Sequence, residues 1–487
     1  MTYNHRVIMR TVSVILIFEG MAMLIPFICA VIYKETAPAA AFLLFSIACI
    51  VFGWTMFRTL RYYSLNIKTR EGYFVVFISW ITVCVIGALP YAYSDCGYSF
   101  VDSLFESFAG WSTTGAWVLD VNNMPKSLIL WKSVCNWLGG MGIIVLTLSI
   151  FPILGIGGQR MANAEVPGPE LEKFAAKIGE TAKISYRIYI VLTIVELAML
   201  LPSMSPYNAL VNTLSSISTA GIVNIYGGVS LHFTPYIKTV LVFFSIVGSI
   251  NFVTYFYLYT GKAKLALQSV EVRTYIGILA SASLLVAIML TLTGEHGSFL
   301  DALGNSVTQV VSFGSTSGFT VDNINTWPST CKIVLIMVMI IGGCGFSTSG
   351  GIKVVRVVVF WKLIKRGGYR RIHPNSVKSI MIHGKPVSTE NASSITVFLM
   401  LYFALYLFAC LMLSLENQDM ETTLSAVLGA LTNNGTGFGM MYDGYYGMFS
   451  WAGKLFCSIL MLAGRLEMYA IIVLFSRSFW NSDRARS

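Results

Sequence analysis

Four short segments of the chain repeat one pattern, in which small polar residues lead into a glycine. The four glycines lie 106, 97 and 117 residues apart in strongly apolar sequence. A leucine stands 11 residues before the glycine in three copies and 15 residues before it, about one helical turn more, in the third. This repetition predicts four membrane units around one axis, each contributing one wall of a pore. The candidate filter residues are Thr113, Thr114 and Gly115; Thr219, Ala220 and Gly221; Thr316, Ser317 and Gly318; and Asn433, Asn434 and Gly435.

The residue types in these segments suit the removal of water from a cation. A hydrated cation crosses hydrocarbon only if other oxygen atoms replace its water, and rings of backbone carbonyls do this without a fixed charge that would trap the ion. Glycine permits backbone conformations that aim carbonyls at an axis. A preceding Thr or Ser adds a hydroxyl oxygen. The four segments therefore predict the loops of a cation filter.

The composition places these loops in a lipid bilayer. Of 487 residues, 55% are hydrophobic and 11% are charged, which is too little charge to cover the surface of a soluble protein of this size. Counting apolar stretches of about 20 residues predicts ten spans. They cover residues 9–33, 37–57, 72–93, 127–154, 184–203, 236–259, 274–293, 331–361, 394–415 and 449–477.

The last eight spans form four pairs, and each pair encloses one filter segment. The stretch before each filter is too short to cross a membrane and predicts a helix that enters halfway, with its partially negative carbonyl end towards the membrane centre. These half helices cover residues 102–111, 208–217, 302–313 and 423–431. The fold class is an all-α integral membrane protein of four outer helix, half helix, filter and inner helix units. Two accessory helices occupy residues 1–70, and the units follow at 71–159, 160–261, 262–366 and 367–487.

Charge sets the expected orientation. Basic residues gather between spans, as the positive-inside rule requires of cytoplasmic loops, so the net charge of +10 does not indicate a nucleic-acid partner. The loops that carry the filters hold the acidic residues and should face outside. The first span has no convincing cleavage site after it and is expected to be retained. Two long cytoplasmic stretches, 158–183 and 365–393, are either plain connections or docking surfaces for a cytosolic partner.

The third inner span is interrupted by a glycine-rich run. The interruption begins about 15 Å into the span, close to the bilayer centre. Loosened backbone at this depth is tolerated only inside protein or along a water-filled cavity. The run predicts a gate inward of the filter, although a kink that accommodates a neighbouring helix is the alternative. Its candidate residues are Gly342, Gly343, Gly345, Gly350 and Gly351.

Arg465 lies within the last inner span, at a similar depth. An arginine there costs on the order of 2.5–3.5 kcal/mol on insertion scales, so it should face the cavity or bind carbonyls. Its positive charge would raise a barrier to cations and would hold the glycine-rich run across the pore. The alternative is a structural ion pair with Glu467 or another carboxylate.

Catalysis has little support in the sequence. The five histidines show no metal-ligand spacing, and there is no P-loop. Residues 314–318 have Thr316 where a nucleophile elbow would have its serine. The nine cysteines are scattered singly and are expected to act as small hydrophobic residues. We predict no enzyme activity and no organic cofactor in this chain.

Specific motifs now support a family assignment. They are the runs at residues 137–146, 152–158, 164–169 and 350–353, together with the four filters. With these the chain resembles, over nearly its whole length, the TrkH/KtrB superfamily of potassium transporters, and in particular its bacterial TrkH branch.

The resemblance implies potassium uptake across the bacterial inner membrane. It implies a homodimer with one pore per protomer and a cytosolic TrkA-type ring that carries the regulatory nucleotide site. It also assigns ion selection to the four filter glycines and gating to the loop at residues 342–351 and to Arg465. In related plant transporters a serine at the first filter glycine accompanies sodium preference, so Gly115 favours potassium. Thr436 departs from the proline that is usual in the branch.

Two other functions compete with this one. A coupled transporter of an organic solute would use broken helices as a binding site near the membrane midplane and would show two inverted halves. A non-conducting membrane scaffold would recruit a partner through its cytoplasmic loops and would tolerate changes in the filters. Proton or sodium coupling is not encoded in any recognisable motif.

Overall fold

The computed structural model describes residues 5–60, 69–142, 178–221, 234–382 and 385–468, apart from residues 122, 296, 321 and 376–379. The described chain is helical except for one two-stranded hairpin, β1 (Met381–Ile382) with β2 (Lys385–Pro386). The prediction of an all-α protein is therefore confirmed. The runs at 152–158 and 164–169 and most of the stretch 158–183 lie outside the described residues.

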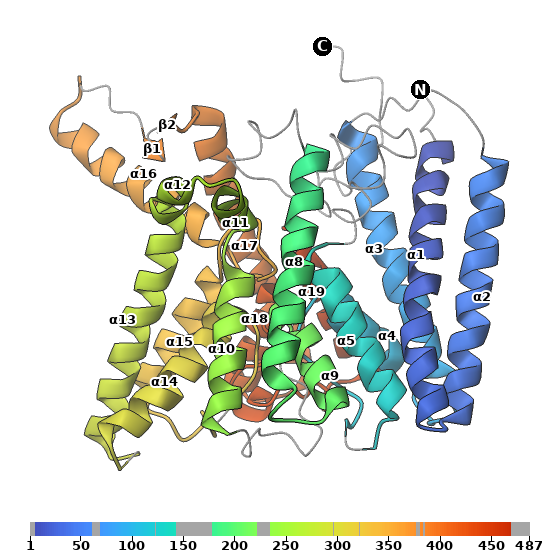
Figure 1. Ribbon diagram of the computed structural model, residues 1–487. Coiled ribbons are helices and arrows are strands. Elements are labelled where there is room, and N and C mark those ends of the chain that lie inside the picture. Colours follow the sequence, from blue (N-terminus) through green and yellow to red (C-terminus); the bar gives the residue numbers. More distant parts are fainter. Residues whose placement is uncertain are drawn as a thin grey trace.

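Long apolar helices form the outer part of the molecule (Figure 1). Within the described ranges, five helices are long and apolar enough to cross a membrane: α1 (His5–Ile32), α2 (Thr36–Thr59), α3 (Thr69–Ala92), α13 (Val270–Thr293) and α17 (Thr389–Leu413). Two of the ten predicted spans, 127–154 and 449–477, continue past the described residues, so the count of ten remains a prediction.

One predicted span is not straight. The apolar stretch 236–259 forms two helices, α10 (Pro235–Ser249) and α11 (Phe252–Tyr259), which meet at an angle of 91°. Ile250 is extended, and the side chain of Asn251 accepts a hydrogen bond from the backbone N–H of Val253, which starts a new helix. The prediction of one continuous helix is wrong here, because an N-cap residue interrupts a continuously apolar stretch.

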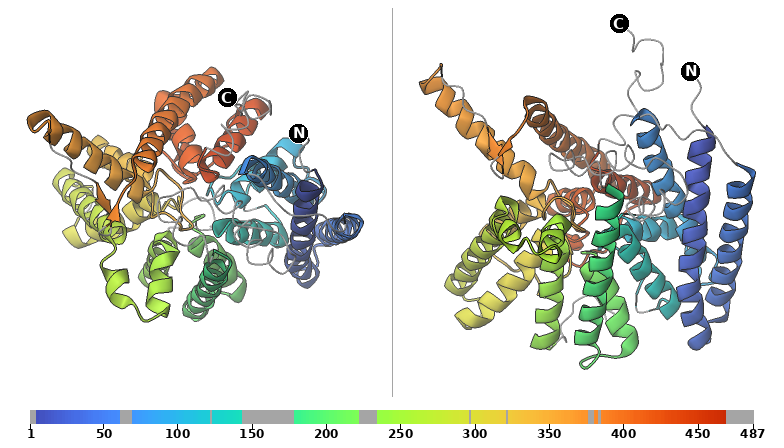
Figure 2. Two further views of the ribbon diagram at one scale, coloured as in Figure 1. Left: turned by 90° about the horizontal axis from the view of Figure 1, so that it is seen from above. Right: turned by 45° about the horizontal axis from the view of Figure 1, so that its top comes forward.

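The predicted repeat of outer, half and inner helix is present four times. Seen from above, the units surround a common centre, with α1 and α2 at one side (Figure 2, left). The first unit uses α3, α4 (Phe100–Trp111) and α5 (Lys126–Gly140). The others use α8 (Ile178–Leu200), α9 (Pro206–Ile217) and α10; α13, α14 (Phe299–Gly314) and α15 (Ser329–Ile341); and α17, α18 (Met420–Thr432) and α19 (Trp451–Arg465).

The remaining described elements connect these units. Helix α12 (Ala263–Leu267) leads from α11 to the third unit, and α16 (Val354–Ile372) follows the glycine-rich run that ends α15. Short 3-10 turns occupy Ser414–Glu416 and Gly439–Met441.

The half helices begin at polar caps. The side chains of Ser99, Ser205, Ser298 and Asp419 each accept a hydrogen bond from the backbone N–H three residues further on. This satisfies an N–H that would otherwise lack a partner. Hydrogen bonds from the side chain and the backbone of Thr422 hold the pKa of Asp419 below its usual range. The predicted half helices are confirmed to within three residues at each end.

The accessory helices pack closely on each other and on the first unit. A Cβ at Gly53 would lie 2.8 Å from the carbonyl oxygen of Ser13, so a larger residue would force α1 and α2 apart. Between these helices, Glu35 reaches the start of α5. Its carboxylate accepts hydrogen bonds from the backbone N–H groups of Lys126 (2.7 Å) and Ser127 (3.1 Å) and from the Ser127 hydroxyl. A carboxylate at a helix N-terminus also interacts favourably with the helix dipole.

We predict that Glu35→Ala lowers the thermal unfolding midpoint of the purified protein. The substitution leaves the first N–H groups of α5 without this acceptor, a loss of about 1–2 kcal/mol. The midpoint is measured in detergent by size-exclusion chromatography after heating. Glu295→Ala, which removes an exposed carboxylate after α13, is the control and should not move the midpoint. An unchanged midpoint in Glu35→Ala would contradict this account of the docking.

Candidate functional site

The four filter segments share a backbone turn that could not be predicted from their sequences. The residue two positions before each glycine is left-handed, with φ of 57° at Thr113, 53° at Thr219, 57° at Thr316 and 57° at Asn433. A β-branched residue rarely adopts this conformation. Its presence at three equivalent positions marks backbone strain that the surrounding structure maintains.

The same turn is closed by the same hydrogen bond in every unit. The backbone N–H of the next residue donates to the carbonyl five positions earlier, at 2.9 Å for Thr114, 2.9 Å for Ala220, 2.9 Å for Ser317 and 3.0 Å for Asn434. This is the Schellman geometry that ends a helix. The chain therefore leaves each half helix in the same way and enters the filter in the same direction.

The four filter segments meet at Gly115. The position that a Cβ of Gly115 would take lies 3.2 Å from the carbonyl oxygen of Ser317, 3.3 Å from that of Ala220 and 3.4 Å from that of Asn434. These three residues hold equivalent places in the other three units. A Cβ at Gly435 would likewise fall 2.7 Å from the backbone nitrogen of Gly115. The structure thus brings all four predicted filter segments together, with carbonyl oxygens facing one point.

Buried side chains hold the filter segments from behind. The Asn433 amide donates to the Thr114 hydroxyl (3.1 Å) and to the carbonyl of Met461 (2.7 Å), which ties the fourth segment to the first. The Asn434 amide donates to the hydroxyl of Thr436 (2.9 Å). Thr436 therefore has a partner inside its own filter, which a proline at this position would not offer.

The glycine-rich run lies against the inner side of the filters. It leaves α15 at Gly342, where φ is 67°. The N–H of Gly350 donates to the hydroxyl of Thr316 (2.7 Å), and that of Gly351 donates to the carbonyl of Thr432 (3.0 Å). Thr348 reaches the second unit, where its hydroxyl donates to the carbonyl of Gly248 at 2.9 Å. The run thus contacts the inner ends of units two, three and four.

Two further predicted gate glycines, Gly343 and Gly345, lie against neighbouring side chains. A Cβ at Gly343 would overlap the hydroxyl of Ser349 in the same loop. The N–H of Gly345 donates to the carboxylate of Glu271 on α13 at 2.6 Å. The amide of Asn251 donates to the same carboxylate at 3.1 Å. Sequence reasoning missed Glu271, because a single glutamate at the start of an outer helix carries no motif.

Arg465 connects the run to the first unit. Its guanidinium donates to the carbonyl of Thr348 (2.6 Å) and to those of Gly139 and Gly140 (2.6 Å each). Gly139 and Gly140 end α5, so the cation also lies at the negative end of that helix. The predicted choice of carbonyl ligands is confirmed. Arg465 is the last residue of α19 and not a mid-helix residue as predicted, because left-handed residues follow it at positions 467 and 468.

The alternative partner of Arg465, Glu467, forms an ion pair with Arg356 of α16. Arg356 also lies over the ring of Phe398, 4.2 Å from its centroid. Lys353, which directly precedes α16, is buried, and its ammonium group donates a hydrogen bond to the carbonyl of Ser349. Glu467 was considered only as a partner of Arg465, and Arg356 and Lys353 were not predicted at this site, although Lys353 belongs to the motif at residues 350–353.

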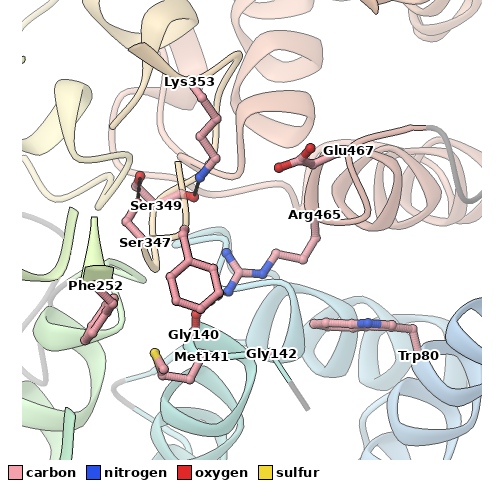
Figure 3. Close-up of a pocket in the computed structure, with 13 residues that line it drawn as sticks. Trp80, Gly140, Met141, Gly142, Phe252, Ser347, Ser349, Lys353, Arg465 and Glu467 are labelled. Carbon is pink, nitrogen blue, oxygen red and sulfur yellow. Dashed lines mark hydrogen bonds between the residues drawn. The ribbon is translucent and has the colours of Figure 1, made fainter. Parts of the chain in front are cut away.

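Lys353, Arg465 and Glu467 border a pocket beside the glycine-rich run. Figure 3 shows the Arg465 guanidinium pointing into it towards Gly140, with Lys353 and Ser349 on one side and Trp80 on the other. The charged residues that line the pocket are Lys353, Arg465 and Glu467. In the described part of the chain, no group of three His, Cys, Asp or Glu residues could hold a metal ion.

Comparison with known proteins gives a consistent result. The family model TrkH, described as a cation transport protein, matches residues 38–483. The "Trk system potassium uptake protein TrkH" of Salmonella typhimurium is 32% identical over 482 residues, which covers 98% of this chain and 99% of that protein. The protein of the same name from Vibrio parahaemolyticus is 30% identical over 486 residues, covering 98% of this chain and 100% of that protein.

The solved structures agree. The crystal structure of the potassium transporter TrkH from Vibrio parahaemolyticus superposes with a TM-score of 0.88 at 28% identity, and the match covers 98% of this chain and 100% of that one. The extent of these matches, with the long apolar helices, settles both family and location. The chain belongs to the TrkH family of cation transport proteins and is a multi-pass protein of the bacterial inner membrane.

Proposed function

We propose that this chain takes up potassium through the pore whose filter is built from the four glycine segments. The observation that carries the proposal is the convergence of the carbonyl oxygens of Ala220, Ser317 and Asn434 on Gly115. Carbonyl oxygens replace the hydration shell of a cation without trapping it. The relatives named as potassium uptake proteins, together with glycine rather than serine at position 115, support potassium as the ion.

The units of the pore are residues 71–159, 160–261, 262–366 and 367–487, after two accessory helices at 1–70. The four equivalent left-handed turns support this division. They also favour a pore over a solute transporter with two inverted halves, because each unit presents its half helix and filter in the same sense. The membrane potential alone supplies an inward drive of about 2.3 kcal/mol per charge for each 100 mV.

The run from Gly342 to Gly351 and Arg465 form the gate of this pore. The contacts of the run with Thr316 and Thr432 support a position directly inward of the filter. The guanidinium fastens it to α5 and adds a positive charge to the path. Opening requires these hydrogen bonds to break together and the run to move aside.

The regulatory partner is a cytosolic TrkA-type nucleotide-binding ring, and the transporter is a homodimer. Both parts of the proposal rest on the family resemblance. The exposed basic residues Lys365, Arg370 and Arg371 at the end of α16 support a docking surface there. Since α16 carries Arg356, whose partner Glu467 lies two residues after Arg465, a force on α16 would reach the gate.

We predict that Gly115→Ser weakens potassium selection. The new Cβ would lie within 3.2–3.4 Å of three filter carbonyls, so these oxygens must move by a few tenths of an ångström. The ratio of rubidium to sodium uptake into proteoliposomes should fall about tenfold, which corresponds to about 1.4 kcal/mol. Gly277→Ser on α13, where a Cβ meets no atom within 4 Å, should keep the wild-type ratio. An unchanged ratio in Gly115→Ser would argue against a filter at this position.

We also predict that Arg465→Ala increases the rate of rubidium uptake several-fold to about tenfold. The substitution removes three charge-assisted hydrogen bonds and one positive charge from the path. The uptake rate of Arg465→Lys should lie between those of the wild type and Arg465→Ala. A single ammonium group cannot donate to all of these carbonyls with the planar geometry of a guanidinium. Arg273→Ala, which removes an exposed arginine from α13, is the control. Uptake by folded Arg465→Ala at or below the wild-type rate would refute the gate.

A further inference from the structure

The first filter differs from the other three in the side chain that its half helix places behind it. Nine residues before each filter glycine, on the half helix, stand Glu106, Asn212, Gln309 and Ala426. All four are buried. Only the first can carry a charge, so the four walls of the filter are not supported in the same way.

Glu106 binds the strand that leaves the first filter. One carboxylate oxygen accepts hydrogen bonds from the backbone N–H groups of Val118 (2.6 Å) and Leu119 (2.9 Å). The other accepts from the ammonium group of Lys132 on α5 at 2.6 Å. The Glu106 side chain has no exposed surface, and that of Lys132 is 12% exposed. Both carboxylate oxygens are therefore occupied in a site shielded from water.

Lys132 extends the same brace to the filter itself. Its ammonium group also donates to the carbonyl of Ala116 (2.8 Å), the residue directly after Gly115. Trp117, which follows, is held by the fourth unit, since its N–H donates to the carbonyl of Gly444 and its carbonyl accepts from Tyr446. From Ala116 to Leu119, each residue thus has at least one backbone group fixed by a hydrogen bond.

The side chains that hold the strands after the third and fourth filters are neutral and come partly from other positions of the half helices. In the third unit the Gln309 amide donates to the carbonyl of Phe319 at 3.5 Å. The hydroxyl of Ser312 donates to the carbonyl of Phe319 at 2.5 Å. In the fourth unit the hydroxyl of Ser425 donates to the carbonyl of Phe438 (3.1 Å) and accepts from its N–H (3.0 Å). Charge-assisted hydrogen bonds are stronger than neutral ones, and the first filter has four of them, so the wall at Gly115 is held most stiffly of these three.

We propose that Glu106 and Lys132 form a positioning pair that sets the spacing of the carbonyl ring around Gly115 and thereby the preference for the larger cation. The pair has no net charge, so it acts through geometry and not by attracting ions. This inference rests on the proposed function. It adds two specificity-determining residues that do not touch the ion.

The test compares rubidium and sodium uptake by proteoliposomes that hold wild-type protein or single variants. Glu106→Gln keeps the side-chain volume. Both oxygens of Glu106 accept hydrogen bonds, so in either orientation of the glutamine amide its NH2 group faces another donor and that hydrogen bond is lost. We expect the rubidium-to-sodium ratio to fall at least about fivefold, as for the loss of a buried charge-assisted hydrogen bond. Lys132→Met should lower the ratio similarly, and Lys132→Arg should preserve it.

In the double variant, Glu106→Gln with Lys132→Met, the rubidium-to-sodium ratio should fall no further than in the more affected single variant. Both substitutions disable the same pair of residues, so their effects should not add. A matched control is Lys332→Met. Lys332 pairs with Glu421 at 2.7 Å, but this second carboxylate is 47% exposed at the rim. The control should keep the wild-type ratio.

Several outcomes would overturn the inference. Wild-type ratios in both Glu106→Gln and Lys132→Met would show that the pair does not set selection. A fall in total uptake and in the thermal midpoint at a constant ratio would leave the pair a purely structural role. Failure of the proposed function is distinguishable from both, because the wild-type protein would then show no preference for rubidium.

Discussion

Four separate stretches of backbone must bring carbonyl oxygens to one point inside a membrane, and most of this structure serves that constraint. Gly115 can lie within contact distance of carbonyls from the other three units only because it has no side chain. Carbonyl oxygens repel each other when no cation lies between them, so the surrounding protein must hold them. The left-handed turn before each glycine and its closing hydrogen bond give all four walls the same direction.

The parts of this design that depend on composition and spacing were predictable. Apolar length located the helices, and stretches such as 102–111 and 302–313 were too short to span, so they were predicted to be half helices. The strained turns were not predictable, since Thr113 and Thr316 adopt a conformation that threonine normally avoids. Tertiary contacts, such as the hydrogen bond from the Gly350 N–H to the Thr316 hydroxyl, support it in addition to the local hydrogen bond that closes the turn. The bend at Asn251 was hidden because hydropathy does not register a capping side chain.

Charged residues were the hardest to place. The sequence locates Arg465 and Glu467 two positions apart, yet Glu467 pairs with Arg356, which is 111 residues away. Left-handed backbone at Glu467 turns the chain after α19 ends, so the two side chains leave in different directions. Glu106 and Lys132 posed the same difficulty, because either residue alone fits the ordinary expectation of a solvated charge. Their burial follows from packing between α4 and α5, which no local pattern encodes.

The four units have the same order of helices and turns, but each of the other features occurs in one unit only. The first carries the charged brace, the third the glycine-rich run, and the fourth Arg465, which joins the run to the first. An exact fourfold assembly could not do this, because a run such as 342–351, repeated four times, would meet its own copies on the axis. Fusing the units in one chain lets each diverge. Because Arg465 contacts both Thr348 and the end of α5, movement of the run must change the surroundings of the helix that also carries Lys132. The proposed gate and filter are thus connected through α5, because its last residues bind Arg465 and its Lys132, about two turns earlier, binds Ala116.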